Sequence, residues 1–242
     1  VPLTSLVHVR LDTDRRTQLD VLVDETQVEE SRFLAGISAG LGLRNSVLLD
    51  ERCFLIVEGE TEEAAVPALF RVATGRSINA SGISVLNTRG SGSIRRLTEI
   101  LVDKWGRDVV VLADSDARSE LNGSGWLARL GLVEGTTVFF VGEREFEDSF
   151  PDARWCGVLS AHYLPADGSP WSSSEIAGCR NQDKFSEQLL NLVRRRCRDG
   201  TITKPDLGLA LAASVTGVAG LPEQVRACMV ATKALAERGG NP

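Results

Sequence analysis

The sequence predicts an α/β fold in which about four parallel strands form one sheet flanked by helices. Three observations favour this class. From Cys53 onward, short apolar runs alternate with stretches of helical period, which is the pattern of strands joined by crossover helices. The runs are apolar throughout, as expected for strands that are buried on both faces. Glycine, serine and other turn-forming residues separate the segments.

Four apolar runs are assigned to strands: 53–57, 82–86, 108–113 and 137–141. The helix after the first run has apolar residues at the i, i+3, i+4 and i+7 positions of one face, from Val66 to Ala73. Pro67 interrupts this helix, and an interior proline costs about 3 kcal/mol, so we expect a late start or a kink. Ser91 or Ser93 is expected to cap the next helix, and a short helix over 126–130 precedes the fourth strand.

The flanks of this unit are less regular. Residues 6–11 and 18–23 are compatible with strands, and a glycine-interrupted helix is expected over 33–49. Beyond Phe150 the chain is expected to be loop-rich until a helix over 183–199, which two further helices follow, opened by Pro205 and Pro222. We therefore divide the chain into an N-terminal segment (1–50), a central α/β domain (51–150) and a mainly helical lobe (151–242).

Composition restricts the class of protein. No apolar run approaches the 18 or so residues of a membrane span, and five scattered cysteines without a Cys-x-x-Cys pair indicate neither a zinc site nor a disulfide framework. These features predict a cytoplasmic protein. The net charge of −6 argues against a general affinity for nucleic acid, but basic residues are concentrated in two segments. Residues 89–107 contain five basic and two acidic residues, and residues 180–204 contain seven basic and three acidic residues.

Acidic residues follow the first and third predicted strands. Glu58 and Gly59 end the first strand, Glu62 lies in the first turn of the next helix, and Asp114 and Asp116 end the third strand. Ligands gather at the carboxyl ends of parallel strands. Closely spaced carboxylates repel one another unless a cation joins them, and Mg²⁺ and Mn²⁺ prefer oxygen ligands. The two motifs, about 56 residues apart, therefore predict a divalent-metal site.

The motifs Glu58-Gly-Glu-Thr-Glu62 and Asp114-Ser-Asp116 resemble the TOPRIM domain shared by topoisomerases, bacterial primases and recombination proteins. Thr61-Glu62 after the glycine resembles more narrowly the overcoming lysogenization defect (OLD) family nucleases, in which an ABC-type ATPase domain precedes a C-terminal TOPRIM nuclease. The resemblance covers roughly residues 33–210. It implies a Rossmann-like TOPRIM fold and a divalent-metal-dependent DNA endonuclease, with residues 1–50 as the end of an ATPase part that this chain lacks.

The resemblance also implies a set of catalytic residues. Two Mg²⁺ or Mn²⁺ ions would be held by four carboxylates: Glu58, Glu62, Asp114 and Asp116. One further acid after the fourth strand is expected to complete the site. We assign this role to Glu147, with Glu145 and Asp148 as rivals in the same acid-rich loop.

OLD nucleases also carry a lysine shortly before a helix, and Thr203-Lys204-Pro205-Asp206 fits that pattern. If Pro205 occupies the first helical position, Lys204 lies at the cap, where backbone amides and an ammonium can meet a phosphate together. Lys204 is therefore expected to stabilise the negative charge of the transition state. Six residues are candidate contacts to the DNA backbone: Arg89, Ser91, Arg95, Arg96, Arg194 and Arg195.

Two other functions compete with this hypothesis. A TOPRIM module that binds nucleic acid or a partner without cutting would not need four mutually repelling carboxylates. A haloacid-dehalogenase-like small-molecule phosphatase also has an Asp-x-Asp motif after a buried strand. In that family, however, the motif lies near the start of the core domain, whereas here an acidic strand-turn-helix precedes it.

Overall fold

A computed structural model of the chain describes residues 7–11, 17–21, 51–182 and 184–238. It divides into two compact units, residues 1–51 and 52–242, which are described separately. In the first unit, strands β1 (Val7–Leu11) and β2 (Thr17–Val21) pair in antiparallel fashion and coincide with the two strands expected there. The helix expected over 33–49 lies outside the described residues.

The second unit is built on a four-stranded parallel sheet with the order β4-β3-β5-β6. Its strands agree closely with the four predicted ones: β3 (Cys53–Val57), β4 (Ile83–Asn87), β5 (Asp108–Asp114) and β6 (Val138–Val141). Strand β3 lies between β4 and β5, so Leu55 faces Val85 on one side and Val110 on the other. The predicted α/β class is confirmed.

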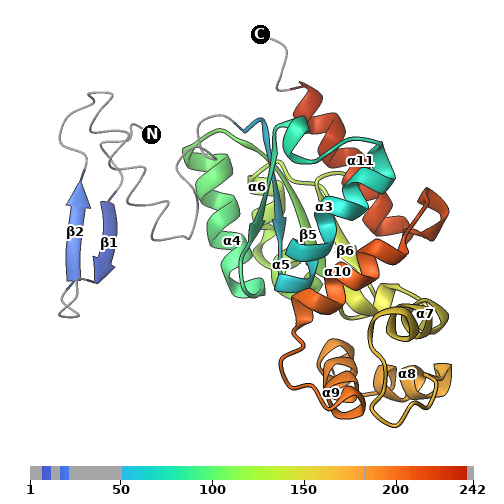
Figure 1. Cartoon of the computed structure of the whole chain (residues 1–242). Helices are drawn as coiled ribbons and strands as arrows, with labels where there is room; N and C mark the ends of the chain where they lie inside the picture. The colour runs from blue at the N-terminus through green and yellow to red at the C-terminus, as the bar shows by residue number, and fades with distance from the viewer. Residues whose placement is uncertain (1–6, 12–16, 22–50, 183, 239–242) are drawn as a thin grey trace. The chain divides into compact units, whose positions relative to one another are not determined.

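Helices cover the sheet on both faces (Figure 1). Helix α3 (Glu60–Thr74) connects β3 to its neighbour β4. Helix α4 (Ser91–Glu99) then leads from β4 to β5, on the other side of β3. Because both connections are crossovers of the same hand, the reversal of direction puts these two helices on opposite faces. The last helix, α11 (Glu223–Arg238), contacts α3 as well as β3, β5 and β6. Helix α11 thus helps to bury the sheet.

Helix α3 begins at Glu60, directly after the turn at Gly59, so the expected late start is wrong. Pro67 lies within the helix and is exposed, as is Glu63 one turn earlier. Proline has no backbone N–H, so the carbonyl of Glu63 lacks the hydrogen bond that residue 67 would otherwise donate. Because both residues are exposed, water can donate to this carbonyl instead. The opposite face of α3 buries Val66, Leu69 and other apolar residues, and this packing outweighs the cost of the proline.

Helix α4 also begins differently from the prediction. Its N-cap is Gly90, without a side-chain cap, and Ser91 is the first helical residue. The hydroxyl of Ser91 donates to Glu120 Oε2 at 3.0 Å rather than to the backbone of its own helix. The helix continues as a π-helical turn (η3, Ile100–Lys104) before β5. Five short elements occupy the connections: η2 (Asn79–Ser81), η4 (Ser115–Ala117), α5 (Arg118–Asn122), η5 (Gly123–Gly125) and α6 (Trp126–Arg129).

The region after Phe150 is more helical than predicted. Five elements follow the turn η6 (Phe146–Ser149) before α11: α7 (Asp152–His162), α8 (Ser173–Arg180), α9 (Phe185–Cys197), α10 (Lys204–Ser214) and η7 (Val218–Gly220). The expected loop over most of 151–182 is wrong. Helix α7 buries Trp155, Val158 and Leu159 on one face, a pattern too short to stand out among the prolines of this region. Ser172 and Glu175 form a capping box that starts α8.

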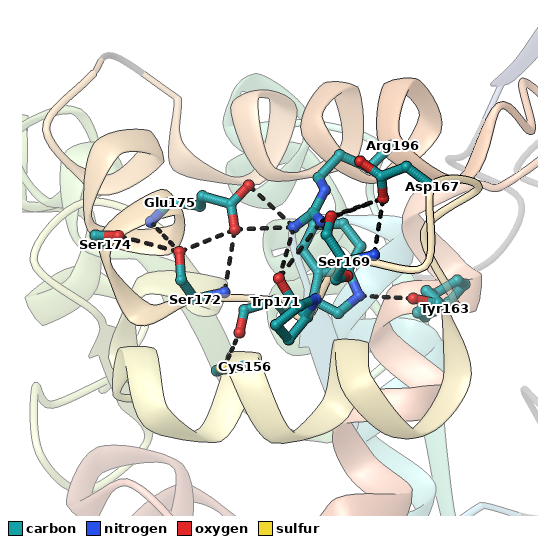
Figure 2. A network of polar contacts seen from close by, with 10 residues as sticks. Cys156, Tyr163, Asp167, Ser169, Trp171, Ser172, Ser174, Glu175 and Arg196 are labelled. Carbon is teal, nitrogen blue, oxygen red and sulfur yellow. Dashed lines mark hydrogen bonds and ion pairs between the residues drawn. The ribbon is translucent and has the colours of Figure 1, made fainter.

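Arg196 on α9 joins the segment between α7 and α8 to the rest of the helical region (Figure 2). Its guanidinium lies 4.4 Å from the ring of Trp171 and donates to both carboxylate oxygens of Glu175 at 2.9 and 3.0 Å. It also donates to the backbone and the hydroxyl of Ser169. Trp171 in turn donates its indole N–H to Tyr163 O at 2.6 Å. This mostly buried arginine fixes a connection that has little regular structure of its own.

One hydrophobic core extends from β3 through α3 to α7, α9, α10 and α11. Helix α10 packs closely on α3: a Cβ added at Gly208 would lie 2.7 Å from the backbone oxygen of Thr61. All five cysteines are free thiols. Among the described residues, no helix combines the length and the apolar character that crossing a lipid bilayer requires.

Candidate metal centre

The predicted acids of β3 and β5 meet at one edge of the sheet. Because the two strands are parallel neighbours, Glu58 and Asp114 emerge side by side, and the backbone N–H of Asp114 donates to Glu58 Oε2 at 3.2 Å. Asp116 follows in η4. One carboxylate oxygen from each of Glu58, Asp114 and Asp116 lies within 4.8 Å of the others. Asp116 is exposed and the other two are half-buried, so this triad is open to solvent on one side.

Two further carboxylates lie deeper. Glu62, in the first turn of α3, is 3% exposed, and Glu147, in η6, is 7% exposed. The hydroxyl of Thr61 donates to Glu147 Oε1 at 2.7 Å and so positions it from the neighbouring helix. A Cβ at residue 59 would lie 2.9 Å from Glu62 Oε2, so Gly59 leaves the space that the Glu62 side chain occupies.

The rivals of Glu147 have other partners. Asp148 accepts hydrogen bonds from the backbone N–H groups of residues 143–145 at 2.6 to 2.9 Å and thereby closes the turn after β6. Glu145 is buried and accepts from the backbone N–H of Ser186 at 2.8 Å, so it holds the start of α9. Of the three acids, Glu147 is the one that the structure directs toward Thr61 and Glu62.

Buried contacts fix the turn that carries Glu147. The indole N–H of Trp155 donates to Glu147 O at 3.0 Å. The guanidinium of Arg180 donates to Asp148 O at 2.6 Å and to Phe150 O at 2.7 Å, while its Nε binds Asp152. Side chains of helices α7 and α8 therefore hold the backbone of η6, the turn that carries Glu147, in place.

A cavity of about 320 Å³ is lined by six acids and by three basic residues, Arg89, Lys184 and Lys204. The acids are Glu58, Glu60, Glu62, Asp114, Glu145 and Glu147, whereas Asp116 lies outside the lining. The ammonium of Lys204 donates to Ser186 Oγ at 3.0 Å, and Ser186 is only 4% exposed. Thr203 is the N-cap of α10 and forms a capping box with Asp206, so Lys204 is the first helical residue. The sequence predicts Lys204 as the N-cap and Pro205 as the first helical residue. The helix therefore begins one residue earlier than predicted.

Burial and mutual repulsion shift the pKa values of these acids upward. Burial raises the pKa of Asp114 well above its usual range, and the charges of Glu62, Glu147 and Glu58 raise it further. Burial also raises the pKa of Glu62, and Glu147 and Glu58 add to the effect while Lys204 opposes it. The pKa values of Glu58 and Glu147 are raised as well, again chiefly by burial. These carboxylates are therefore costly to ionise together unless a cation binds between them.

The donor set fits a divalent cation of the hard class. It consists of carboxylate oxygens without histidine or thiolate, which is the preference of Mg²⁺ and Mn²⁺ rather than Zn²⁺. Among the described residues, only Glu58, Asp114 and Asp116 bring one oxygen each within 4.8 Å of the others. The charges of Glu62 and Glu147 raise the pKa of Asp114, so these two deeper acids act on the same carboxylate from inside the domain.

Comparison with known families agrees with this site. Residues 51–116 match the model of the overcoming lysogenization defect protein-like TOPRIM domain. The chain carries an OLD-like TOPRIM domain. The matched segment contains both acidic motifs, from Glu58 to Asp116. No curated protein matches the sequence of the whole chain.

Solved structures share the fold over a longer stretch than the family model. The C-terminal region of the Burkholderia pseudomallei OLD protein aligns with a TM-score of 0.53 and 19% identity, covering 78% of this chain and 99% of that one. Two structures of the C-terminal region of the Xanthomonas campestris pv. campestris OLD protein give TM-scores of 0.53 and 0.54 at 16% and 17% identity. Each covers 80% of this chain and all of that one. The helical region after the TOPRIM domain therefore belongs to the shared fold.

The basic residues expected to contact DNA are placed unequally around the TOPRIM domain. Arg89 lines the acidic cavity. Arg95 donates to Gly123 O at 2.8 Å and lies over the ring of Trp126, and Ser91 is bound to Glu120, so both take part in packing α4. Arg96 is exposed on the same helix. On α9, Arg194 donates to Ile202 O at 2.7 Å, and Arg195 is exposed. Apart from Arg89, these residues do not line the cavity.

Sequence reasoning assigned no role to four side chains of this cavity: Glu60, Thr61, Lys184 and Ser186. Thr61 lies inside the Glu58-Gly-Glu-Thr-Glu62 motif, and its hydroxyl could have been considered as a partner for a second acid. Ser186 and Lys184 carry no motif of their own. They reach the cavity only because Glu145 binds the first turn of α9, a contact across 41 residues of sequence.

The TOPRIM domain should gain stability when a divalent cation binds. A carboxyl group whose pKa is raised in the folded state stabilises the fold while it is protonated. The metal-free protein should therefore lose stability as pH rises from about 4, the unfolded value, toward the higher folded values. A cation that binds only the folded state adds about 2.7 kcal/mol at a hundredfold excess over its dissociation constant.

Thermal melts at pH 5 and pH 8, in chelator and in millimolar Mg²⁺ or Mn²⁺, measure this effect. We expect the gain from metal to be larger at pH 8. Asp114→Asn should gain less from metal than the wild type at pH 8, because it removes one carboxylate of the triad. A wild-type melting temperature that ignores both metals at pH 8 would contradict the assignment of the site.

Proposed function

We propose that this chain is a divalent-metal-dependent DNA endonuclease that hydrolyses phosphodiester bonds. The observation that carries the proposal is the convergence of Glu58, Glu62, Asp114 and Glu147 with Lys204 in one cavity at the carboxyl edge of an OLD-like TOPRIM sheet, with Asp116 beside Glu58 and Asp114 in the outer triad. A scaffold that only binds a partner has no need of mutually repelling buried acids. Their cost to stability is therefore best accounted for by a catalytic site.

The residues divide into roles by position. Glu58, Asp114 and Asp116 would hold one Mg²⁺ or Mn²⁺ ion, and Glu62, Glu147 and Asp114 would hold a second. When bound, the ions supply Lewis-acid activation of water and neutralise the charge of the leaving oxygen. The protein side contributes rigidity, since Thr61 fixes Glu147 and the backbone of Asp114 fixes Glu58.

Lys204 would contact the phosphate. Its ammonium is held by the buried hydroxyl of Ser186, so the charge is fixed before a substrate arrives. A preorganised cation of this kind stabilises the negative charge that develops in a phosphoryl-transfer transition state. The N-terminus of α10 begins at Lys204, and the positive end of its helix dipole also favours an anion there.

The substrate and the setting follow from the same reasoning. We infer that the site acts on DNA in the cytoplasm and that its activity is linked to an OLD-type ATPase region, because the structures that share the fold are C-terminal regions of OLD proteins. Free thiols at all five cysteines agree with a reducing compartment.

A plasmid-cleavage assay tests the proposed activity. Supercoiled DNA should be nicked or linearised in Mg²⁺ or Mn²⁺ and should stay intact in chelator. Release of inorganic phosphate from a small phosphomonoester, measured in parallel, serves as the comparison for a phosphatase. Phosphate release without any conversion of plasmid would overturn the proposal in favour of a haloacid-dehalogenase-like phosphatase.

A further inference from the structure

Two basic residues that line the cavity have a backbone conformation that residues other than glycine rarely adopt. Among the described residues, three other than glycine have positive φ: Arg89 (54°), Lys184 (59°) and Arg198 (53°). Arg198 ends α9, where the left-handed conformation is an ordinary helix cap. Arg89 and Lys184 have no such explanation, and both line the acidic cavity. Unfavourable backbone that persists at a site points to a function for the side chains it presents.

The turn that contains Arg89 is held against Glu58, the residue that follows β3. The backbone N–H of Arg89 donates to the side chain of Asn87 at 2.8 Å, and Asn87 donates to Glu63 Oε2 on α3 at 2.8 Å. The next residue, Gly90, donates its N–H to Glu58 O at 3.0 Å. Arg89 is therefore held by its neighbours on both sides, while its own side chain is exposed.

The first turn of α9 fixes the backbone of Lys184. It is the N-cap of α9, where an extended backbone is usual, but it has φ 59° and ψ 71°. Its carbonyl accepts from the N–H groups of residues 187 and 188 at 3.1 Å, and Glu145 holds Ser186 two residues later. Lys184 lines the same cavity as Glu58. Burial raises the pKa of Glu58, and the charge of Lys184 opposes that shift.

Neither cation makes a hydrogen bond or an ion pair with a described residue through its side chain, although six carboxylates line the same cavity. Lys204 differs in this respect, because Ser186 holds it. A single phosphate bound at the metal site and Lys204 would leave Arg89 and Lys184 without an anionic partner. Two further fixed cations match a ligand that brings further phosphates on the same strand.

We propose that Arg89 and Lys184 bind the phosphates that flank the scissile one, so that the site selects a polynucleotide strand over an isolated phosphodiester. This inference rests on the proposed nuclease function and names its substrate class. The two residues are positioning residues for the strand and take no part in the chemical step.

DNA binding measured against salt concentration tests the inference without requiring cleavage. Fluorescence anisotropy with a labelled duplex, in Ca²⁺ and again in chelator, gives the slope of log affinity against log salt. Each of Arg89→Ala and Lys184→Ala should reduce that slope by about one unit, since each removes one phosphate contact. The double variant should lose about two units.

Matched controls separate charge from folding. Arg89→Gly and Lys184→Gly keep the positive φ without strain and should behave as the alanine variants do, whereas Lys184→Arg should restore the slope. Lys104→Ala and Arg226→Ala remove exposed cations that do not line the cavity and should leave the slope unchanged. Equal slopes for the wild type and the double variant would overturn the inference.

A single-phosphodiester substrate supplies the second arm of the test. In the double variant, kcat/KM for DNA cleavage should fall by about tenfold or more, and by clearly more than kcat/KM for bis(p-nitrophenyl) phosphate, which brings no flanking phosphates. Equal losses on both substrates would place the two cations in the chemistry and overturn the assignment. A wild type that binds DNA with the expected slopes but cuts neither substrate would support this inference and overturn the nuclease proposal.

Discussion

Asp114→Asn is expected to abolish metal-dependent DNA cleavage while leaving the fold intact. Asp114 belongs to the outer triad and also interacts with Glu62 and Glu147, so its loss affects both groups of ligands. Removing a group that only supports a metal ligand costs about 10–100-fold. Loss of a shared carboxylate should exceed that range and take plasmid cleavage in Mg²⁺ or Mn²⁺ below detection.

Asp108→Asn is the matched control for this variant. Asp108 begins the same strand, β5, that Asp114 ends, and it is half-buried to a similar degree. The same chemical change at the amino edge of the sheet should leave cleavage unchanged. Normal nicking by chelator-washed Asp114→Asn protein would contradict the assignment, and an equal loss in Asp108→Asn would show that the assay reports stability rather than catalysis.

Lys204→Ala is expected to slow cleavage by about a hundredfold or more, the effect of losing one oriented group that stabilises a transition-state charge. The variant should fold, because the capping box between Thr203 and Asp206 that starts α10 does not use the lysine side chain. Metal binding, measured by thermal shift, should survive, since a protonated lysine is not a metal ligand. Single-turnover cleavage rates give the size of the effect.

Ser186→Ala distinguishes a fixed lysine from a mobile one. It keeps the ammonium but removes the hydroxyl that holds it, so cleavage should fall by less than in Lys204→Ala. Lys233→Ala on α11, where the lysine pairs with Glu237, should cut normally. A Lys204→Ala protein that cuts at the wild-type rate would return Lys204 to the status of a surface residue.

The sheet and the acids at its edge could be predicted because their signals are local. Fully apolar runs define β3 and β5, and carboxylates directly after such runs must lie together once the strands pair in parallel. The start of α3 was harder to place, since Pro67 carries a strong unfavourable propensity that packing overcomes. Local propensity and tertiary burial act in opposite directions there, and the sequence displays only the first.

The remainder of the cavity depends on contacts between distant segments. The hydroxyl of Thr61, 86 residues earlier in the chain, donates to Glu147 and holds its carboxylate near the other acids. Its neighbours Glu145 and Asp148 have the same charge and similar surroundings in sequence, so nothing local separates the three. Lys184 is likewise hidden, because a positive φ at a lysine leaves no trace in composition or periodicity.

The order in which the cavity residues occur along the chain has a consequence for synthesis at the ribosome. Every carboxylate of the cavity lies between Glu58 and Glu147, whereas Lys184, Ser186 and Lys204 all come later. At about 5–20 residues per second, several seconds separate the emergence of the acids from that of Lys204. During that interval a nascent chain can gather its acids but has no lysine to receive a phosphate. Under the proposed function, cleavage therefore becomes possible only after translation has passed α10.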